Sequence, residues 1–375
     1  MIQRDLVKTI KKSIKPGFIS IIYGPRRVGK TVLLQQLISQ FTKEKNIVFN
    51  GDTQETRDLL SSTSETVLTN TVKNADIVVI DEAQRIENIA LSLKILIDKF
   101  PEKKIFVTGS SSIDIAKGIK ETLTGRTNKF RLYPLSTKEI TSQIQKFQKS
   151  YLLEEQLIYG GYPYLQSLNT STEKQEYLKS ITEDYLFRDI LLLKEIERPD
   201  NLRKLTTLLA FQIGSEVSLN ELANNLNIDV KTVQRYISLL KQGFIIFEHS
   251  AYSTNLRSEV SKTKKYYFWD LGIRNAVTEQ FLPLNSRTDV GSLWENFLAV
   301  ERLKKQEYSQ TPTTNYFWRS YDQAEIDWIE INQENIQAYE FKWKNKKART
   351  PKAFKEAYKT EVHEISKNNY LDFIL

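Results

Sequence analysis

The sequence predicts an α/β protein with a parallel-sheet core, then a helical region, then a second α/β region. Three observations lead to this prediction. Gly24 to Thr31 reads G-x-x-x-x-G-K-T between a short apolar segment and a segment of helical period. Three further apolar segments alternate with helical patterns as far as Gly109, which is typical of a parallel sheet covered on both faces. Two alternating segments over 325–343 predict a β-hairpin.

Composition narrows the class of protein. The chain has 375 residues, of which 40% are hydrophobic and 27% charged, as in ordinary water-soluble proteins of two or three domains. It has no cysteine and only two histidines, which excludes disulfides, thiolate nucleophiles and histidine-rich metal sites. The net charge of +8 is compatible with nucleic-acid binding and equally with a solvated lysine-rich surface.

The sequence shows no pattern of a secretory signal or a membrane span. The N-terminal residues are rich in lysine and lack a long apolar segment. Nothing approaches the roughly 18 consecutive apolar residues that a membrane-spanning helix needs. We therefore expect a cytoplasmic protein without a membrane partner.

The octet from Gly24 to Thr31 has the pattern of a phosphate-binding P-loop. The strand predicted over 18–23 and the helix predicted over 32–38 are the context that supports this interpretation. Backbone N–H groups and the start of the helix would face the phosphates, Lys30 would reach the β- and γ-phosphates, and Thr31 would bind Mg²⁺. The predicted nucleotide-binding residues are Gly24, Pro25, Arg26, Arg27, Val28, Gly29, Lys30, Thr31 and Val32.

The other core elements follow in order along the chain. Amphipathic spacing predicts helices over 2–14 and 87–99. Continuous or alternating apolar residues predict strands over 46–50, 76–82, 104–109 and 129–133.

Two carboxylates, Asp81 and Glu82, end the apolar strand that follows the P-loop by roughly fifty residues. Asp81 would hold Mg²⁺, and Glu82 would act as the general base for the water that attacks the γ-phosphate. The alternative is that the pair only caps the next helix.

Thr108 and Arg126 complete the predicted catalytic set with Lys30 and Glu82. Thr108 ends the next strand, where its hydroxyl would contact the γ-phosphate or the attacking water, or would only bond to the backbone. Arg126 would stabilise charge on the transferred phosphoryl group, in the same chain or across a subunit boundary of a homo-oligomer. The alternative is a surface arginine.

The middle of the chain is predicted to be helical, with a winged helix over 217–249. Ser218 and Asp229 are suitable caps for its two helices, and Gly243 is a suitable stop. The second helix carries Lys231, Gln234, Arg235 and Lys241, which would reach DNA if the helix entered a major groove. The other interpretation is a packing module beside the nucleotide.

The hairpin near the C-terminus predicts a second site. With its turn centred between Gln333 and Glu334, Ile331 faces Ile336, Ile329 faces Ala338 and Asp327 faces Glu340. Facing carboxylates repel each other, and a divalent cation between them would remove the conflict. The alternative is a solvated hairpin end with Lys342 as the local counter-ion.

Several motifs resemble one family of AAA+-type ATPases of bacteria and archaea that carry a C-terminal domain of unknown function. The motifs are GPRRVGKT, IVVIDEAQ, VTGSSS, LTGR-(x)₆-YPLSTKEI, GGYP and the segment 185–190. The resemblance covers most of the chain. It implies an ATPase core of additional-strand topology, a winged helix and a terminal domain similar to PD-(D/E)XK nucleases. In such sites two carboxylates bind Mg²⁺ and a lysine positions water, which here indicates Asp327, Glu340 and Lys342, with Glu295 as a further ligand.

The predicted domains are an ATPase core at 1–150, a helical lid and winged-helix region at 151–255, and a nuclease-like domain at 256–375. The leading functional hypothesis is an Mg²⁺-dependent ATPase that couples ATP to a nuclease-like or DNA-binding domain. The alternatives are a nucleotide-gated DNA-binding switch without nuclease activity, and an interaction scaffold with degenerate catalytic positions.

Overall fold

A computed structural model describes residues 2–109, 123–142, 149–184, 196, 198–252, 264–320, 322–333, 335–344 and 348–375. The chain divides into two compact units, 1–135 and 136–375. The predicted division into three domains stays a prediction, and its boundary between 255 and 256 lies outside the described residues. The serines at 110–112, residue 334 of the predicted turn and the segment 185–190 also lie outside them.

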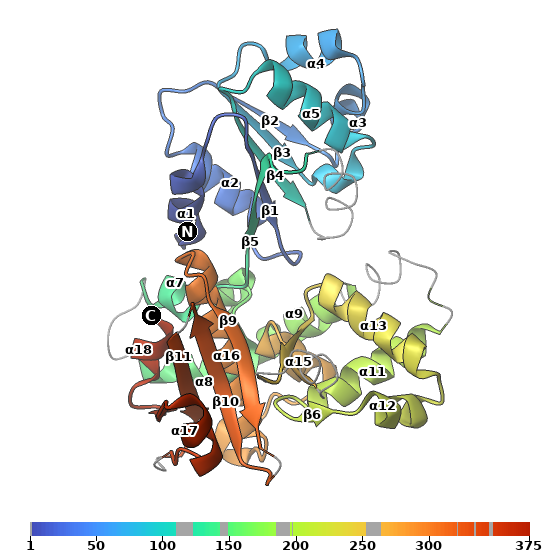
Figure 1. Ribbon diagram of the computed structural model, residues 1–375. Helices are drawn as coiled ribbons and strands as arrows, with labels where there is room; N and C mark the ends of the chain where they lie inside the picture. The colour runs from blue at the N-terminus through green and yellow to red at the C-terminus, as the bar shows by residue number, and fades with distance from the viewer. Residues whose placement is uncertain are drawn as a thin grey trace. The chain divides into compact units, whose positions relative to one another are not determined.

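The first unit is built on a five-stranded parallel sheet, as predicted, in the order β2-β3-β4-β1-β5 (Figure 1). Placing β4 between β1 and β3 is the additional-strand arrangement that the resemblance implies. The strands are β1 (Ile19–Tyr23), β2 (Asn46–Asn50), β3 (Ile77–Asp81), β4 (Lys104–Gly109) and β5 (Thr127–Arg131). The helices are α1 (Leu6–Ser13), α2 (Lys30–Ile38), α3 (Gln54–Leu60), α4 (Glu65–Val72), the 3-10 helix η1 (Ala83–Arg85) and α5 (Ile89–Lys99).

Both faces of this sheet are covered, which explains the continuous apolar runs. Val78 and Ile80 pack with residues of α3, α4 and α5 on one face. Ile77 and Val79 alternate with them on β3 and are also fully buried. Every side chain of β3 is therefore buried, and the strand delivers Asp81 to the carboxyl edge of the sheet.

The second unit combines helices with two sheets, of order β6-β8-β7 and β12-β11-β10-β9 (Figure 1). A bridge from Ala251 to Phe317 joins them. The strands are β6 (Glu216–Val217), β7 (Ile246–Ser250), β8 (Lys264–Phe268), β9 (Thr314–Arg319), β10 (Glu325–Asn332), β11 (Asn335–Phe341) and β12 (Val362–Ile365). The helices are α7 (Thr137–Thr141), α8 (Lys149–Tyr159), η3 (Pro163–Ser167), α9 (Ser171–Thr182), α11 (Pro199–Phe211), α12 (Leu219–Leu226), α13 (Val230–Gln242), α15 (Leu271–Val277), η5 (Leu284–Ser286), α16 (Val290–Tyr308), α17 (Lys352–Tyr358) and α18 (Tyr370–Ile374).

The GGYP motif is explained by close packing against Asp270, the N-cap of α15. Gly160 has φ +76°, and a Cβ there would lie 2.1 Å from Asp270 Oδ1. The same carboxylate accepts hydrogen bonds from the N–H of Gly161 at 2.7 Å and of Ile273 at 3.2 Å. The glycine pair thus allows the end of α8 to approach the start of α15 closely.

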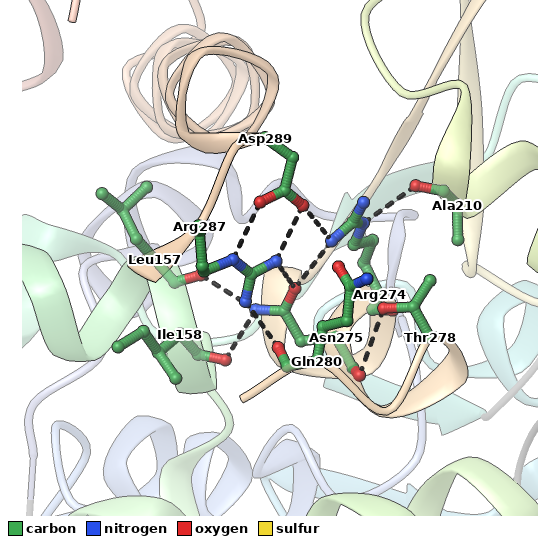
Figure 2. A network of polar contacts seen from close by, with 9 residues as sticks. All are labelled: Leu157, Ile158, Ala210, Arg274, Asn275, Thr278, Gln280, Arg287 and Asp289. Atoms are coloured by element: carbon green, nitrogen blue, oxygen red, sulfur yellow. Dashed lines mark hydrogen bonds and ion pairs between the residues drawn. The ribbon is translucent and has the colours of Figure 1, made fainter. Parts of the chain in front are cut away.

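A buried polar network holds the helices of this unit together (Figure 2). Asp289, which precedes α16, accepts from Arg274 at 2.7 Å and from Arg287 at 2.8 Å. Arg274 Nε also donates to Ala210 O of α11 at 2.9 Å. Asn275 Nδ2 donates to two carbonyls at the end of α8. One network therefore connects α8, α11, α15 and the start of α16.

The predicted hairpin register is confirmed for the pairs that define the ladder. Ile331 faces Ile336 and Ile329 faces Ala338. On its other side, β10 has a bulge against β9 between Ile326 and Ile329. Asp327 lies within this bulge.

Candidate functional site

The P-loop connects β1 to α2 through a tight backbone path. Gly24 passes so close to Leu132 that a Cβ would lie 2.2 Å from the Leu132 carbonyl oxygen. Gly29, the N-cap of α2, has φ +90°, a conformation that side chains rarely adopt. Both glycines are therefore required by the geometry of the loop, in agreement with the prediction.

Lys30 is buried at the start of α2, and its ammonium lies against its own loop. Nζ donates to Gly24 O at 3.1 Å and to Pro25 O at 2.9 Å. Burial lowers the pKa of Lys30 to about 8, although the charges of Glu82 and Asp81 oppose this shift. Phosphate oxygens can replace the two carbonyls, so the lysine is placed for the predicted role.

Asp81 is held between two threonine hydroxyls. Thr31 Oγ1 donates to Asp81 Oδ2 at 2.7 Å, and Thr108 Oγ1 donates to Asp81 Oδ1. Thr108 is completely buried and also accepts from the Glu82 N–H at 3.1 Å. The Thr108 hydroxyl thus bonds to the Glu82 backbone and to the Asp81 side chain, which is closer to the predicted backbone-bonding alternative than to direct contact with the nucleotide.

The donor set around Thr31 and Asp81 fits Mg²⁺. A hydroxyl and a carboxylate are hard oxygen ligands, and few protein ligands are needed because Mg²⁺ keeps several waters and takes phosphate oxygens. The position of these two residues directly at the P-loop is the arrangement that the sequence predicts.

Glu82 follows the last residue of β3 in a left-handed backbone conformation, with φ +51°. Its carboxylate accepts a hydrogen bond from Gln84 Nε2 at 2.5 Å. It does not cap a helix with its side chain, so the simple capping alternative is not what the structure shows. Gln84 was missed as a site residue, although it ends the IVVIDEAQ motif.

Arg126 lies at the end of the sheet away from the P-loop of its own chain, which favours the surface-arginine alternative over a same-chain role. It immediately precedes β5, and Thr127 pairs with Ile19 at the start of β1, whereas the P-loop follows the end of β1. Its guanidinium forms an ion pair with Asp98. A role toward a neighbouring subunit stays a prediction.

Arg131 stands at the opposite end of β5 and was missed by the sequence analysis. It pairs in register with Tyr23, the residue before the P-loop, and its guanidinium lies 5.7 Å from that ring. The parallel register is the signal that identifies it: the last residue of β5 must lie beside the last residue of β1.

Arg4 is a second residue that the sequence did not reveal. Its guanidinium is buried and donates to Val28 O of the P-loop at 2.6 Å and to Tyr133 O at 2.6 Å. It therefore holds the P-loop backbone against the segment that follows β5.

A second group of charged residues lies in the C-terminal unit. We call it the carboxylate cluster: Glu295 on α16, Glu325 and Asp327 on β10, and Glu340 on β11. Partial burial and the charges of Glu295 and Glu340 raise the pKa of Asp327 well above its usual range. The structure thus brings together the residues that were predicted as nuclease-like ligands.

Each carboxylate of the cluster already has a partner within the protein. Lys265 Nζ pairs with Glu295 at 2.9 Å and also with Glu325. Asp327 Oδ2 accepts from the Phe341 N–H at 2.7 Å, and Lys342 pairs with Glu340. Among the described residues, no group of three or more Asp, Glu, His or Cys side chains is arranged to hold a metal ion. The donor set is therefore satisfied internally and does not fit the predicted divalent cation.

The exposed face of α13 carries the polar residues that were expected to meet DNA. Lys231, Gln234 and Arg235 are exposed, while Val233 and Ile237 are buried. Lys241 differs, because its ammonium pairs with Glu248 at 2.6 Å.

Comparison with known proteins agrees with this geometry. Residues 17–141 match a family described as AAA domain. The N-terminal unit has the fold of a P-loop ATPase. Residues 130–285 and 290–371 match families described as domains of unknown function, DUF8612 and DUF4143. The AAA match supports an ATP-binding ATPase, and the two other matches leave the nuclease prediction untested.

Similar proteins come from archaea and bacteria. The uncharacterized protein MJ1544 of Methanocaldococcus jannaschii is 26% identical over 96% of this chain and 82% of its own length. The uncharacterized protein Rv2008c of Mycobacterium tuberculosis is 23% identical over 88% of this chain and 71% of its own. The Walker-type ATPase PABY2304 of Pyrococcus abyssi is 15% identical, with a TM-score of 0.50 over 74% of this chain and 96% of that one.

Within the described ranges, the structure has no helix whose length and apolar character would suffice to span a bilayer.

Proposed function

We propose that this chain binds ATP with Mg²⁺ at the P-loop, hydrolyses it, and uses the nucleotide state to control its C-terminal unit. The observation that carries the proposal is the contact of Asp81 with the Thr31 and Thr108 hydroxyls beside Lys30. This arrangement brings the proposed metal-binding and phosphate-binding groups together at one edge of the sheet.

Each residue has a distinct part in this proposal. Lys30 holds the β- and γ-phosphates, and Thr31 and Asp81 hold the metal ion. Bound Mg²⁺ would neutralise charge on the phosphates. Glu82 takes a proton from the attacking water, and Thr108 keeps Asp81 and the Glu82 backbone in place. Arg131 is positioned at the same sheet edge to interact with the nucleotide.

Two substitutions test the proposal. Lys30→Ala should abolish turnover and weaken ATP binding, since the main cationic contact with the phosphates is removed. Glu82→Gln should retain ATP affinity but lower turnover by about 10²-fold or more, because the amide cannot accept the proton. Turnover and the dissociation constant of a fluorescent ATP analogue would be measured separately.

A matched control for Lys30 is Lys103→Ala. Lys103 is also a buried lysine that donates to two backbone carbonyls, those of Lys73 and Ala75. It precedes β4, at the edge of the sheet opposite the P-loop. Unchanged turnover in Lys30→Ala, or an equal loss in Lys103→Ala, would refute the assignment of the P-loop as the catalytic site.

A second candidate function is nucleotide-gated DNA binding without cleavage. The exposed Lys231, Gln234 and Arg235 on α13 favour it, because they share one solvent-facing side of a helix in a helix–turn–helix arrangement. In this proposal, the order α11, β6, α12, α13, β7 and β8 is interpreted as a winged helix.

A further inference from the structure

The carboxylate cluster contains an internal cation that the sequence analysis did not assign. Lys265 lies on β8, and the exposed fraction of its side chain is 1%. Its ammonium is 2.9 Å from Glu295 Oε1 and also contacts a carboxylate oxygen of Glu325. The Phe317 ring lies 5.2 Å from Nζ and closes another side of the group.

The neighbouring side chains are arranged around this ammonium. Tyr267, two residues further along β8, donates its hydroxyl to the same Glu295 oxygen at 2.6 Å. Arg319 lies on the far side of Glu325 and pairs with it at 3.8 Å and with Glu216 at 2.9 Å. One oxygen of Glu295 and both oxygens of Glu325 are thus in contact with donors of the protein.

We infer that Lys265 is the resident cation of the carboxylate cluster and that it excludes a divalent metal ion from it. The proposal concerns the C-terminal unit alone and does not depend on ATP hydrolysis. It explains why the predicted metal ligands lie close together and yet are paired with groups of the protein.

The exclusion has a simple physical cause. A metal ion bound by Glu295 and Asp327 would have to displace the ammonium from Glu295, or share the site with it at a few ångströms, where two positive charges repel strongly. Lys265 lies on β8, and its side chain is buried between α16 and β10. To reach solvent, its ammonium would have to break the ion pairs with Glu295 and Glu325. Removal of its charge, in contrast, takes away the ion pair of Glu295, which lies beside Asp327, while Glu325 keeps Arg319. A divalent cation would then relieve the repulsion between Glu295 and Asp327.

The experiment compares full-length wild-type protein with Lys265→Met, which keeps a long side chain without charge. Each is titrated with Mn²⁺ alone, without nucleotide, by calorimetry and by thermal denaturation. Wild type should bind no Mn²⁺ through this cluster at millimolar concentration. Lys265→Met should melt at a lower temperature and bind Mn²⁺ with an affinity at least about tenfold above wild type, recovering part of the lost stability. Adding Asp327→Asn to Lys265→Met should cancel this response.

A matched control is Lys304→Met. Lys304 is also buried in the same unit and pairs with Glu301, which lies outside the cluster, at 2.7 Å. This variant should lose stability without gaining a response to Mn²⁺. If wild type binds Mn²⁺ and Asp327→Asn does not, the proposal is overturned. This comparison is informative even if the Lys265 variant does not fold. A folded Lys265→Met protein that gains no Mn²⁺ affinity would overturn it as well.

Discussion

Asp81 is the residue on which the geometry of the nucleotide site depends. Its two carboxylate oxygens are each bonded to a threonine hydroxyl, one from the P-loop and one from the end of β4. Thr108 carries no charge, but it connects Asp81 to the backbone N–H of Glu82. A small neutral side chain therefore contacts both the carboxylate of Asp81 and the backbone of Glu82.

Thr108→Val tests this positioning role, since valine has the same shape without the hydroxyl. We expect turnover to fall by about tenfold or more, about 1.4 kcal/mol in the activation free energy, with little change in ATP affinity. Steady-state kinetics and ATP-binding measurements separate the two effects. Thr206→Val is the control, because Thr206 is also fully buried and bonds to Leu202 O within its own helix, α11. Equal turnover in wild type and Thr108→Val would contradict the role.

At the scale of helices and strands, the register of the sheet and close packing determine where each side chain lies. The parallel pairing of β5 with β1 places Arg126 at one edge of the sheet and Arg131 at the other. In the second unit, α15 is held by Asp270 on one side and by the Asp289 network on the other. Because these contacts join several elements of the second unit, single substitutions there should affect the whole unit.

Asp289→Ala tests the network of Figure 2. The side chains of Arg274 and Arg287 are only 1% and 2% exposed and would lose their carboxylate partner. We expect a loss of about 3–5 kcal/mol in the free energy of unfolding, because buried charges are left unpaired. Urea denaturation measures it. Glu183→Ala removes an exposed pair with Arg203 and should cost below about 1 kcal/mol. Similar losses in the two variants would show that the network is no stronger than a surface pair.

The pH dependence of this contribution has a defined sign. Burial alone would raise the pKa of Asp289, but the hydrogen bonds and charges of Arg287 and Arg274 hold it below its usual value. The stabilisation is therefore present above the unfolded-state pKa and is lost as pH falls through the folded-state pKa. The difference in stability between wild type and Asp289→Ala should shrink in acid.

At the scale of the whole molecule, one unit carries the nucleotide site and the other carries the exposed face of α13. Coupling between them would make DNA affinity depend on the bound nucleotide. The carboxylate cluster enters this picture as a part of the second unit whose charges are partly offset by Lys265, Lys342 and Arg319. The predicted subunit-crossing role of Arg126 would add a dependence of turnover on protein concentration.

Fluorescence anisotropy with duplex DNA tests the coupling. The double variant Lys231→Ala/Arg235→Ala should weaken binding and reduce its salt dependence, since two phosphate contacts are lost. Arg349→Ala/Lys352→Ala removes the same charges from exposed positions elsewhere in the unit and should have little effect. ATP should change the affinity of wild type but not of Lys30→Ala. Equal effects of the two double variants would attribute DNA binding to net charge alone.

The sequence by itself determined the P-loop, the strand that ends in Asp81, and the register of the C-terminal hairpin. These features depend on local spacing: the glycine pattern, the burial of both faces of a strand, and the period of two along a short hairpin. Tertiary structure alone decided the rest. Arg4 meets a carbonyl 129 residues away, Thr108 meets Asp81 across 27 residues, and Lys265 meets Glu295 across 30. Such contacts follow from the order and register of strands that are distant in sequence, and no local period encodes them. The pairing of Arg126 with Asp98 and the contact of Lys265 with the carboxylate cluster are of this kind.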